Sequence, residues 1–125
     1  MSLTITPLQT DGFASQVALE DDVVVLSLSG TADLKVWRGL GEMLTEVHGE
    51  ARRLEAKRVV VDVRDLEFMN SSCFKSIVTW LTSIMDLETA DQYKVHFRSN
   101  PERLWQRRSL HALRSFALML VTIES

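Results

Sequence analysis

The sequence predicts an α/β fold in one domain, residues 1–125. After residue 23, short β-branched runs alternate with longer segments in which apolar residues recur at helical spacing, a pattern typical of helices packed on a sheet. The 125 residues are 46% hydrophobic and 25% charged, which suits one continuous core. No internal repeat and no Pro- or Gly-rich linker divides the chain.

Cysteine content and hydropathy indicate the cellular setting. Cys73 is the only cysteine, so an intramolecular disulfide and a multi-cysteine metal site are excluded, and a reducing compartment fits best. No apolar run reaches the roughly 18–20 residues of a membrane span, and the N-terminus lacks a basic-then-apolar secretion signal. We therefore expect a cytoplasmic protein without a membrane contact. The arginines after residue 97 lack aromatic interleaving, so no nucleic-acid partner is expected.

The first 30 residues predict three strands. Residues 3–8 and 14–19 mix apolar and polar side chains, as short and partly exposed strands do. Asp21 and Asp22 predict a turn. Residues 23–28 form a β-branched run before a Ser-Gly pair, which indicates a buried strand.

Residues 33–54 predict a long surface helix with Asp33 as its N-cap. Gly39, Gly41 and Gly49 each cost such a helix about 1 kcal/mol relative to alanine, so packing of its apolar stripe must stabilise it. The stripe holds Val36, Trp37, Leu40, Met43, Leu44, Val47, Ala51 and Leu54.

Residues 59–63 are all apolar except one, which predicts a strand buried on both faces in the middle of the sheet. Residues 72–87 predict an amphipathic helix. Trp37 of the first helix and Trp80 of this one lie within the apolar stripes and are predicted core residues. The apolar half of the second helix holds Cys73, Phe74, Ile77, Val78, Trp80, Leu81, Ile84, Met85 and Leu87.

The last third of the chain predicts strand, helix and strand. Residues 93–97 alternate apolar and polar side chains, so this strand has one wetter face and lies nearer an edge. Pro101 favours a helix start, because its missing N–H would be unpaired there, and we expect this helix over residues 101–115. Residues 118–123 predict the final strand.

The junction at Asn70, Ser71 and Ser72 is where the sequence points to function. A helix start carries free N–H groups and the positive end of the helix dipole, so a phosphate on either serine would be electrostatically favoured. Helix capping is the simpler interpretation, since Ser and Asn cap well. The residues alone leave both open.

The chain resembles a known family, the STAS domain of bacterial anti-sigma factor antagonists and related sulfate transporter tails. The resemblance covers nearly the whole chain and rests on the stretch 30–33, on residues 59–73, and on Pro101, Leu104 and Leu110. It implies a STAS-type fold, a mixed β-sheet of about four to six strands with about three to four helices packed mainly on one face. The family's Asp-Ser-Ser-Gly motif stands here as Asn-Ser-Ser-Cys, residues 70–73.

What the resemblance implies is a regulatory protein–protein interaction module, without catalytic activity or a cofactor, in a partner-switching pathway. Ser72, and less so Ser71, is the implied phosphoacceptor. The implied partners are an anti-sigma factor-type serine kinase, which binds the unphosphorylated form, and a serine phosphatase; a homodimer is a further possibility. The partner-binding residues carried over are Asp33, Asn70, Ser71, Cys73, Lys75 and Ser76.

Two departures from the motif keep alternatives open. Asn70 removes a negative charge beside the target hydroxyl, and Cys73 replaces a glycine that leaves the serine accessible. A STAS-fold scaffold that does not switch is one alternative, and a small-ligand sensor with an apolar pocket beneath the helices is another. No enzyme and no metal site are expected, because nucleophile–base and metal-ligand spacings are lacking and His48, His96 and His111 are far apart.

Overall fold

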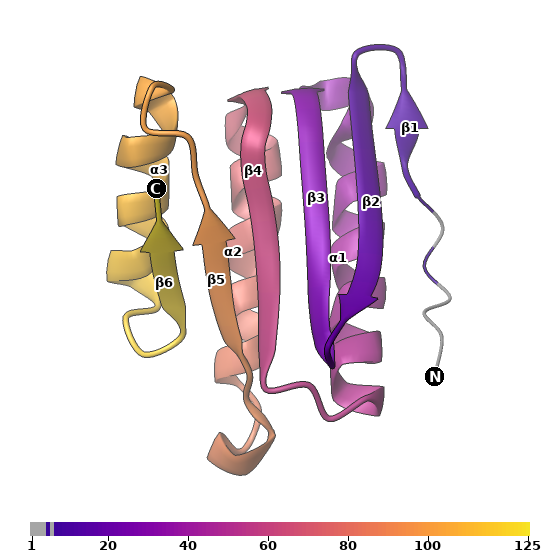
Figure 1. The fold of residues 1–125 in the computed structure, drawn as a ribbon, viewed down its shortest axis with the longest axis vertical. Coiled ribbons are helices and arrows are strands. Elements are labelled where there is room, and N and C mark those ends of the chain that lie inside the picture. Colours follow the sequence, from indigo (N-terminus) through magenta and orange to yellow (C-terminus); the bar gives the residue numbers. More distant parts are fainter. Residues whose placement is uncertain (1–4, 6) are drawn as a thin grey trace.

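The computed structural model describes residue 5 and residues 7–125, and these form strands and helices in alternation (Figure 1). Within this part of the chain the strands make one six-stranded sheet in the order β1-β2-β3-β4-β5-β6. The elements are β1 (Gln9–Thr10), β2 (Phe13–Glu20), β3 (Val23–Ala32), α1 (Leu34–Arg53), β4 (Arg58–Met69), α2 (Ser71–Met85), a 3₁₀ turn (Thr89–Asp91), β5 (Lys94–Arg98), α3 (Leu104–Phe116) and β6 (Val121–Glu124).

The sheet is mixed, as expected for the STAS-type fold. The first three strands pair antiparallel, whereas β3, β4, β5 and β6 pair parallel. Each parallel pair is connected through a helix, and α1, α2 and α3 all lie on one face of the sheet (Figure 1). In the strand predicted at 3–8, residues 3, 4 and 6 lie outside the described residues, and the described ones precede the first strand.

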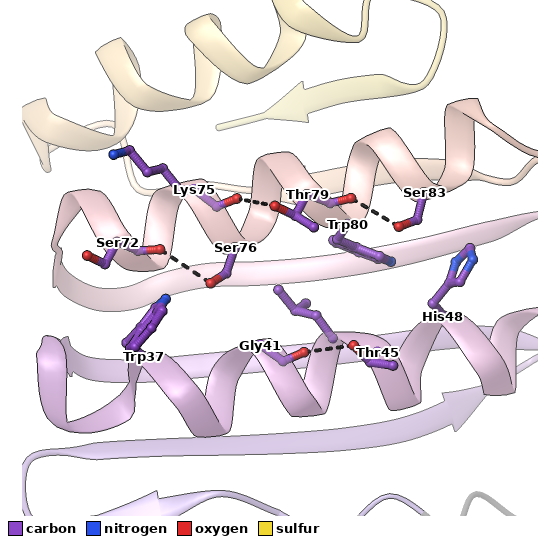
Figure 2. Close-up of a pocket in the computed structure, with 11 residues that line it drawn as sticks. Trp37, Gly41, Thr45, His48, Ser72, Lys75, Ser76, Thr79, Trp80 and Ser83 are labelled. Carbon is purple, nitrogen blue, oxygen red and sulfur yellow. Dashed lines mark hydrogen bonds between the residues drawn. The ribbon is translucent and has the colours of Figure 1, made fainter.

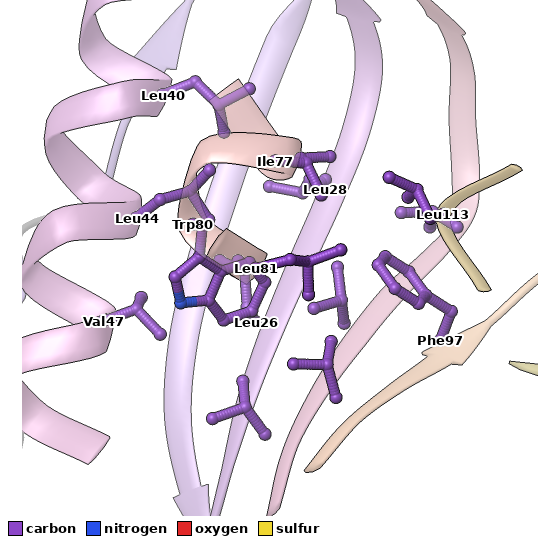
Figure 3. Close-up of a cluster of buried hydrophobic side chains, with 14 of the residues drawn as sticks. Leu26, Leu28, Leu40, Leu44, Val47, Ile77, Trp80, Leu81, Phe97 and Leu113 are labelled. Carbon is purple, nitrogen blue, oxygen red and sulfur yellow. The ribbon is translucent and has the colours of Figure 1, made fainter. Parts of the chain in front are cut away.

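The core lies between the sheet and the helices. Alternate residues of β3 and β4, such as Leu26 and Val61, are fully buried there and meet the apolar stripes of α1 and α2. Figure 3 shows Trp80 and Leu81 of α2 pointing into this layer between α1 and Phe97 of β5. The predicted helices 33–54 and 72–87 agree with α1 and α2 to within one or two residues at each end.

The strand predicted at residues 59–63 is too short. The observed β4 continues to Met69, because the segment that looked like a loop pairs with the end of β3, where the register shifts twice. Thr31 pairs with Phe68 and Ala32 with Met69. The irregular register explains the missed residues, since their side chains do not alternate as a regular strand would.

The helix predicted from Pro101 begins later, at Leu104. The amide of Glu102 donates to the Asn100 side chain, and that of Arg103 donates to the Asn100 carbonyl, so a tight turn precedes the helix. Asparagine stabilises turns through such side-chain bonds. Pro101 therefore belongs to the turn, and its placement in the first helical turn was wrong.

Gln106 attaches α3 to the sheet. Its side chain is fully buried, and its Nε2 donates to the carbonyls of Val63 at 2.6 Å and Leu66 at 3.0 Å. Its Oε1 accepts from the Asn100 amide at 2.8 Å. One side chain thus satisfies three backbone groups at the place where β4 becomes irregular.

Gln106→Leu is expected to lower the free energy of unfolding by about 3 kcal/mol, because three buried backbone groups would lose their partner. Gln92→Leu is the matched control. Gln92 is only half-buried and its Nε2 donates to the carbonyls of Met85 and Leu87 near solvent, so its loss should cost about 1 kcal/mol or less. Urea unfolding monitored by circular dichroism measures both; equal losses would contradict the assigned role.

Candidate functional site

Two helix starts lie side by side at the carboxyl edge of the parallel strands. Asp33 caps α1 by accepting from the Lys35 amide at 2.9 Å, and Asn70 caps α2 by accepting from the Cys73 amide at 2.9 Å. The Asn70 amide also donates to the Ala32 carbonyl at 2.9 Å. The predicted N-cap at Asp33 is confirmed, and the capping role of Asn70 is directly observed.

Ser71 and Ser72 occupy the first turn of α2 but face different surroundings. Ser71 is exposed, beside α3, with Arg108 and Ser109 as neighbours in a shallow surface depression. Ser72 is half-buried and faces α1. Among the described residues, the Ser72 hydroxyl has no hydrogen-bond partner, although its carbonyl accepts from the Ser76 hydroxyl at 3.3 Å. Capping by Asn70 therefore leaves both serine hydroxyls unused.

Cys73 points into the core. Its side chain is fully buried, and the thiol donates to the Asp33 carbonyl at 3.5 Å. Burial, and then the Asp33 carboxylate, raise the pKa of the Cys73 thiol to about 11. The side chain is thus a protonated core residue that does not reach a partner-facing surface, so its place in the predicted partner-binding set was wrong. It also leaves the approach to Ser72 open.

Large apolar side chains are exposed around the two helix starts. Leu34 is 69% exposed, Trp37 44% and Phe68 49%. They come from the first turn of α1 and the end of β4. Trp37 was predicted to be a core residue and this was wrong, because α1 turns it toward α2 at the surface (Figure 2). The sequence signal for Phe68 was missed because β4 was predicted to end earlier.

Cationic side chains accompany these apolar ones. Lys75 lies three and four residues after the serines, so it is on the same side of α2, and it is exposed. Lys35 and Arg38 are exposed on the first turns of α1. Of these cationic side chains, Lys75 is the one that lies beside Ser72 on α2.

A groove of about 550 Å³ runs between α1 and α2, and Ser72 lies at one end of it (Figure 2). We call it the α1–α2 groove. Gly41 forms part of its wall, where an added Cβ would meet only the Ser76 hydroxyl at 3.8 Å, an ordinary contact distance. The lining residues are Trp37, Gly41, Leu44, Thr45, His48, Ser72, Lys75, Ser76, Thr79, Trp80 and Ser83.

His48 and Trp80 line the other end of the groove, and both contact the buried Tyr93 hydroxyl. The Trp80 indole N–H donates to the Tyr93 hydroxyl at 2.8 Å, and His48 Nδ1 lies 2.7 Å from the same hydroxyl. Since Tyr93 is buried and already accepts from Trp80, its O–H donates to a neutral His48. Burial, and then Arg52, lower the pKa of His48, and burial raises the pKa of Tyr93.

The lowered pKa of His48 predicts a pH dependence of stability. Below pH 6.5, the ordinary pKa of a histidine side chain, the unfolded chain takes up a proton before the folded one, so folding stability is lost as the pH falls from there. We expect the free energy of unfolding to decrease between pH 7 and pH 5, and to decrease less in His48→Gln. Chemical denaturation at both pH values tests this; a variant with an unchanged pH dependence would contradict the assignment.

Within residue 5 and residues 7–125, no group of three or more His, Cys, Asp or Glu side chains is arranged to hold a metal ion. No helix in the same part of the chain is long and apolar enough to cross a membrane.

Comparison with known proteins identifies the fold. No protein-family model matches the chain, and no curated protein matches it. An anti-sigma factor antagonist from Mycobacterium paratuberculosis has a similar crystal structure, with a TM-score of 0.61 and 19% identity over 86% of this chain and 84% of that one. The anti-sigma factor antagonist SpoIIAA in its unphosphorylated form gives a TM-score of 0.53 and 14% identity, over 90% and 89%.

These similarities show that the chain has the STAS-type fold seen in anti-sigma factor antagonists. The predicted fold class is therefore confirmed, with a mixed sheet and helices on one face. At such low identity the likeness concerns the fold, and function must be argued from the site itself.

Proposed function

We propose that this protein is a regulatory protein–protein interaction module that acts as an anti-sigma factor antagonist. In this proposal Ser72 is phosphorylated by an anti-sigma factor-type serine kinase, a serine phosphatase restores it, and the pathway operates in the bacterial cytoplasm. The observation that carries the proposal is the surface around Ser72, where an unused hydroxyl lies on the same surface as the exposed Trp37.

The physical basis is a change of charge on an apolar docking surface. A phosphoserine carries about −1.5 to −2 charges and a tight hydration shell. Binding of an apolar partner surface over Ser72 would bury that charge, with only Lys75 nearby on α2 to offset it. The unphosphorylated form would therefore bind the partner and the phosphorylated form would release it.

The two departures from the family motif are compatible with this switch. The Cys73 side chain is buried and does not obstruct Ser72. Asn70 keeps the capping bond that fixes the start of α2, at 2.9 Å from the Cys73 amide. The remaining proposed partner contacts are Asp33, Asn70, Ser71, Lys75 and Ser76.

Phosphosite mapping by mass spectrometry tests the proposal, on protein isolated from its native cells in growing and stressed states. Phosphate on Ser72 that varies between the two states would support the switch. A peptide over residues 70–73 that stays unmodified in both would overturn it, and would favour the scaffold that does not switch or the small-ligand sensor. Phosphate on Ser71 alone would place the phosphoacceptor on the side of α2 that faces α3.

A further inference from the structure

The α1–α2 groove is open at Gly41, although the packing of the two helices does not require a glycine there. Gly41 could carry a methyl group at an ordinary contact distance from Ser76, so the closeness of the two helices does not demand glycine. Its lack of a side chain instead widens the groove at the middle of the wall. The volume of about 550 Å³ lies within the range of small-molecule sites.

The hydroxyl groups of the groove present acceptors. The hydroxyls of Thr45, Ser76, Thr79 and Ser83 each donate to the carbonyl four residues earlier, at 3.0–3.3 Å. Because the hydroxyl hydrogen is used within the helix, the oxygen lone pairs remain for another donor. A ligand with N–H or O–H groups would satisfy them.

The groove has aromatic walls and little charge. Trp37 stands at the Ser72 end and Trp80 forms part of the floor (Figure 2). Among the described lining residues none carries a carboxylate, and Figure 2 shows the ammonium group of Lys75 directed away from α1. An ionised ligand would lose its hydration here without an opposite charge in the groove, whereas a flat apolar ring would pack on the indoles.

We propose that the α1–α2 groove binds a small, uncharged, planar aromatic molecule that carries a hydrogen-bond donor. Its ring packs against the exposed Trp37 over a floor that includes Trp80, and its N–H or O–H group donates to the hydroxyl oxygens of the groove wall. The site lies between the helices at the surface.

Ligand binding would also control the candidate phosphoacceptor, an extension that rests on the proposed function. Ser72 lies at the end of the groove, so a bound ring would shield its hydroxyl from a kinase. Conversely, a phosphate on Ser72 would place a hydrated anion against that ring. A bound ligand is therefore expected to slow phosphorylation of Ser72, and a phosphate on Ser72 is expected to weaken ligand binding.

Two matched dyes test the class of ligand on the unmodified protein. N-phenyl-1-naphthylamine is neutral and carries one N–H donor, and 1-anilinonaphthalene-8-sulfonate is the same molecule with a sulfonate. We expect saturable binding of one neutral dye per chain, seen as a fluorescence increase, and at least tenfold weaker binding of the sulfonate. Absent or unsaturable binding of the neutral dye would overturn the proposal, and so would equal affinities.

Substitutions at two glycines of α1 test where the dye binds. Gly41→Leu fills the groove and is expected to lower the affinity for the neutral dye at least tenfold. Gly49→Leu adds the same side chain where nothing lies within 4 Å and should leave the affinity within twofold. If Gly41→Leu fails to fold, Trp37→Ala replaces it, because Trp37 is 44% exposed and outside the core. Dye binding that tolerates the groove variant would place the dye elsewhere and overturn the site.

The link to Ser72 has a separate readout. Ser72→Asp is expected to lower the affinity for the neutral dye at least threefold, whereas Ser71→Asp, which lies outside the groove, should leave that affinity unchanged. Equal effects of the two variants would overturn the coupling. Since dye titration needs neither kinase nor partner, failure of the groove site and failure of the phosphorylation switch remain distinguishable.

Discussion

Gly30→Ala is expected to lower the free energy of unfolding by about 3 kcal/mol or more. Gly30 has a φ of +87°, a conformation that costs an L-residue roughly 1–2 kcal/mol. A Cβ there would also collide with the carbonyl oxygen of Gly12, which accepts from the Thr31 amide at 2.8 Å. The turn before β2 and the irregular end of β3 would have to separate, which adds to the cost.

Gly12→Ala separates the two causes. Gly12 has a nearly identical φ of +88°, but an added Cβ would meet nothing within 4 Å. Its alanine variant should therefore lose only about 1 kcal/mol, the conformational part alone. Thermal unfolding of the three proteins measures the difference, and we expect Gly30→Ala to melt about 10 °C below the parent. Equal losses in both variants would contradict the proposed collision.

Ser72→Asp is expected to weaken the complex with a candidate anti-sigma factor-type kinase from the same genome by at least about tenfold, or about 1.4 kcal/mol. The new carboxylate lies at the start of α2 and is favoured there by the helix dipole, so the protein itself should stay folded. The substitution therefore lowers the affinity of the complex, in which an apolar partner surface would cover the new charge.

Controls separate this effect from a general loss of surface complementarity. Ser72→Ala should bind as the parent does and should remain bound when the kinase and ATP are supplied. Ser71→Asp places the same charge on the side that faces Arg108 and should weaken binding less than threefold. Titration calorimetry gives all three affinities. A complex that tolerates Ser72→Asp would favour the scaffold that does not switch.

The main elements of the fold could be predicted from local patterns. The helices around Val36 and Ile77 bury one stripe each, and a stripe at helical spacing is visible in any sequence. The buried strand at residues 59–63 and the N-cap Asp33 were predicted for the same reason, since each depends on residues close together in the chain.

Elements that depend on distant residues were predicted less well. The end of β4 forms only because it pairs with the end of β3, some 37 residues earlier by the pairing of Thr31 with Phe68. The true start of α3 depends on the turn at Asn100 and on the buried Gln106. Gln106 has no local signal, because a polar residue is expected outside the core until its partners are known.

The start of the candidate site is visible in the sequence, because two serines after a helix cap are a local pattern around Asn70. The surroundings of the two serines depend on how the helices pack. Packing of α1 against α2 turns Trp37 outward, buries Cys73 and opens a groove at Gly41 that ends at Ser72. The physical reason is that the angle and spacing of two helices arise from side chains on both, and neither helix encodes them alone.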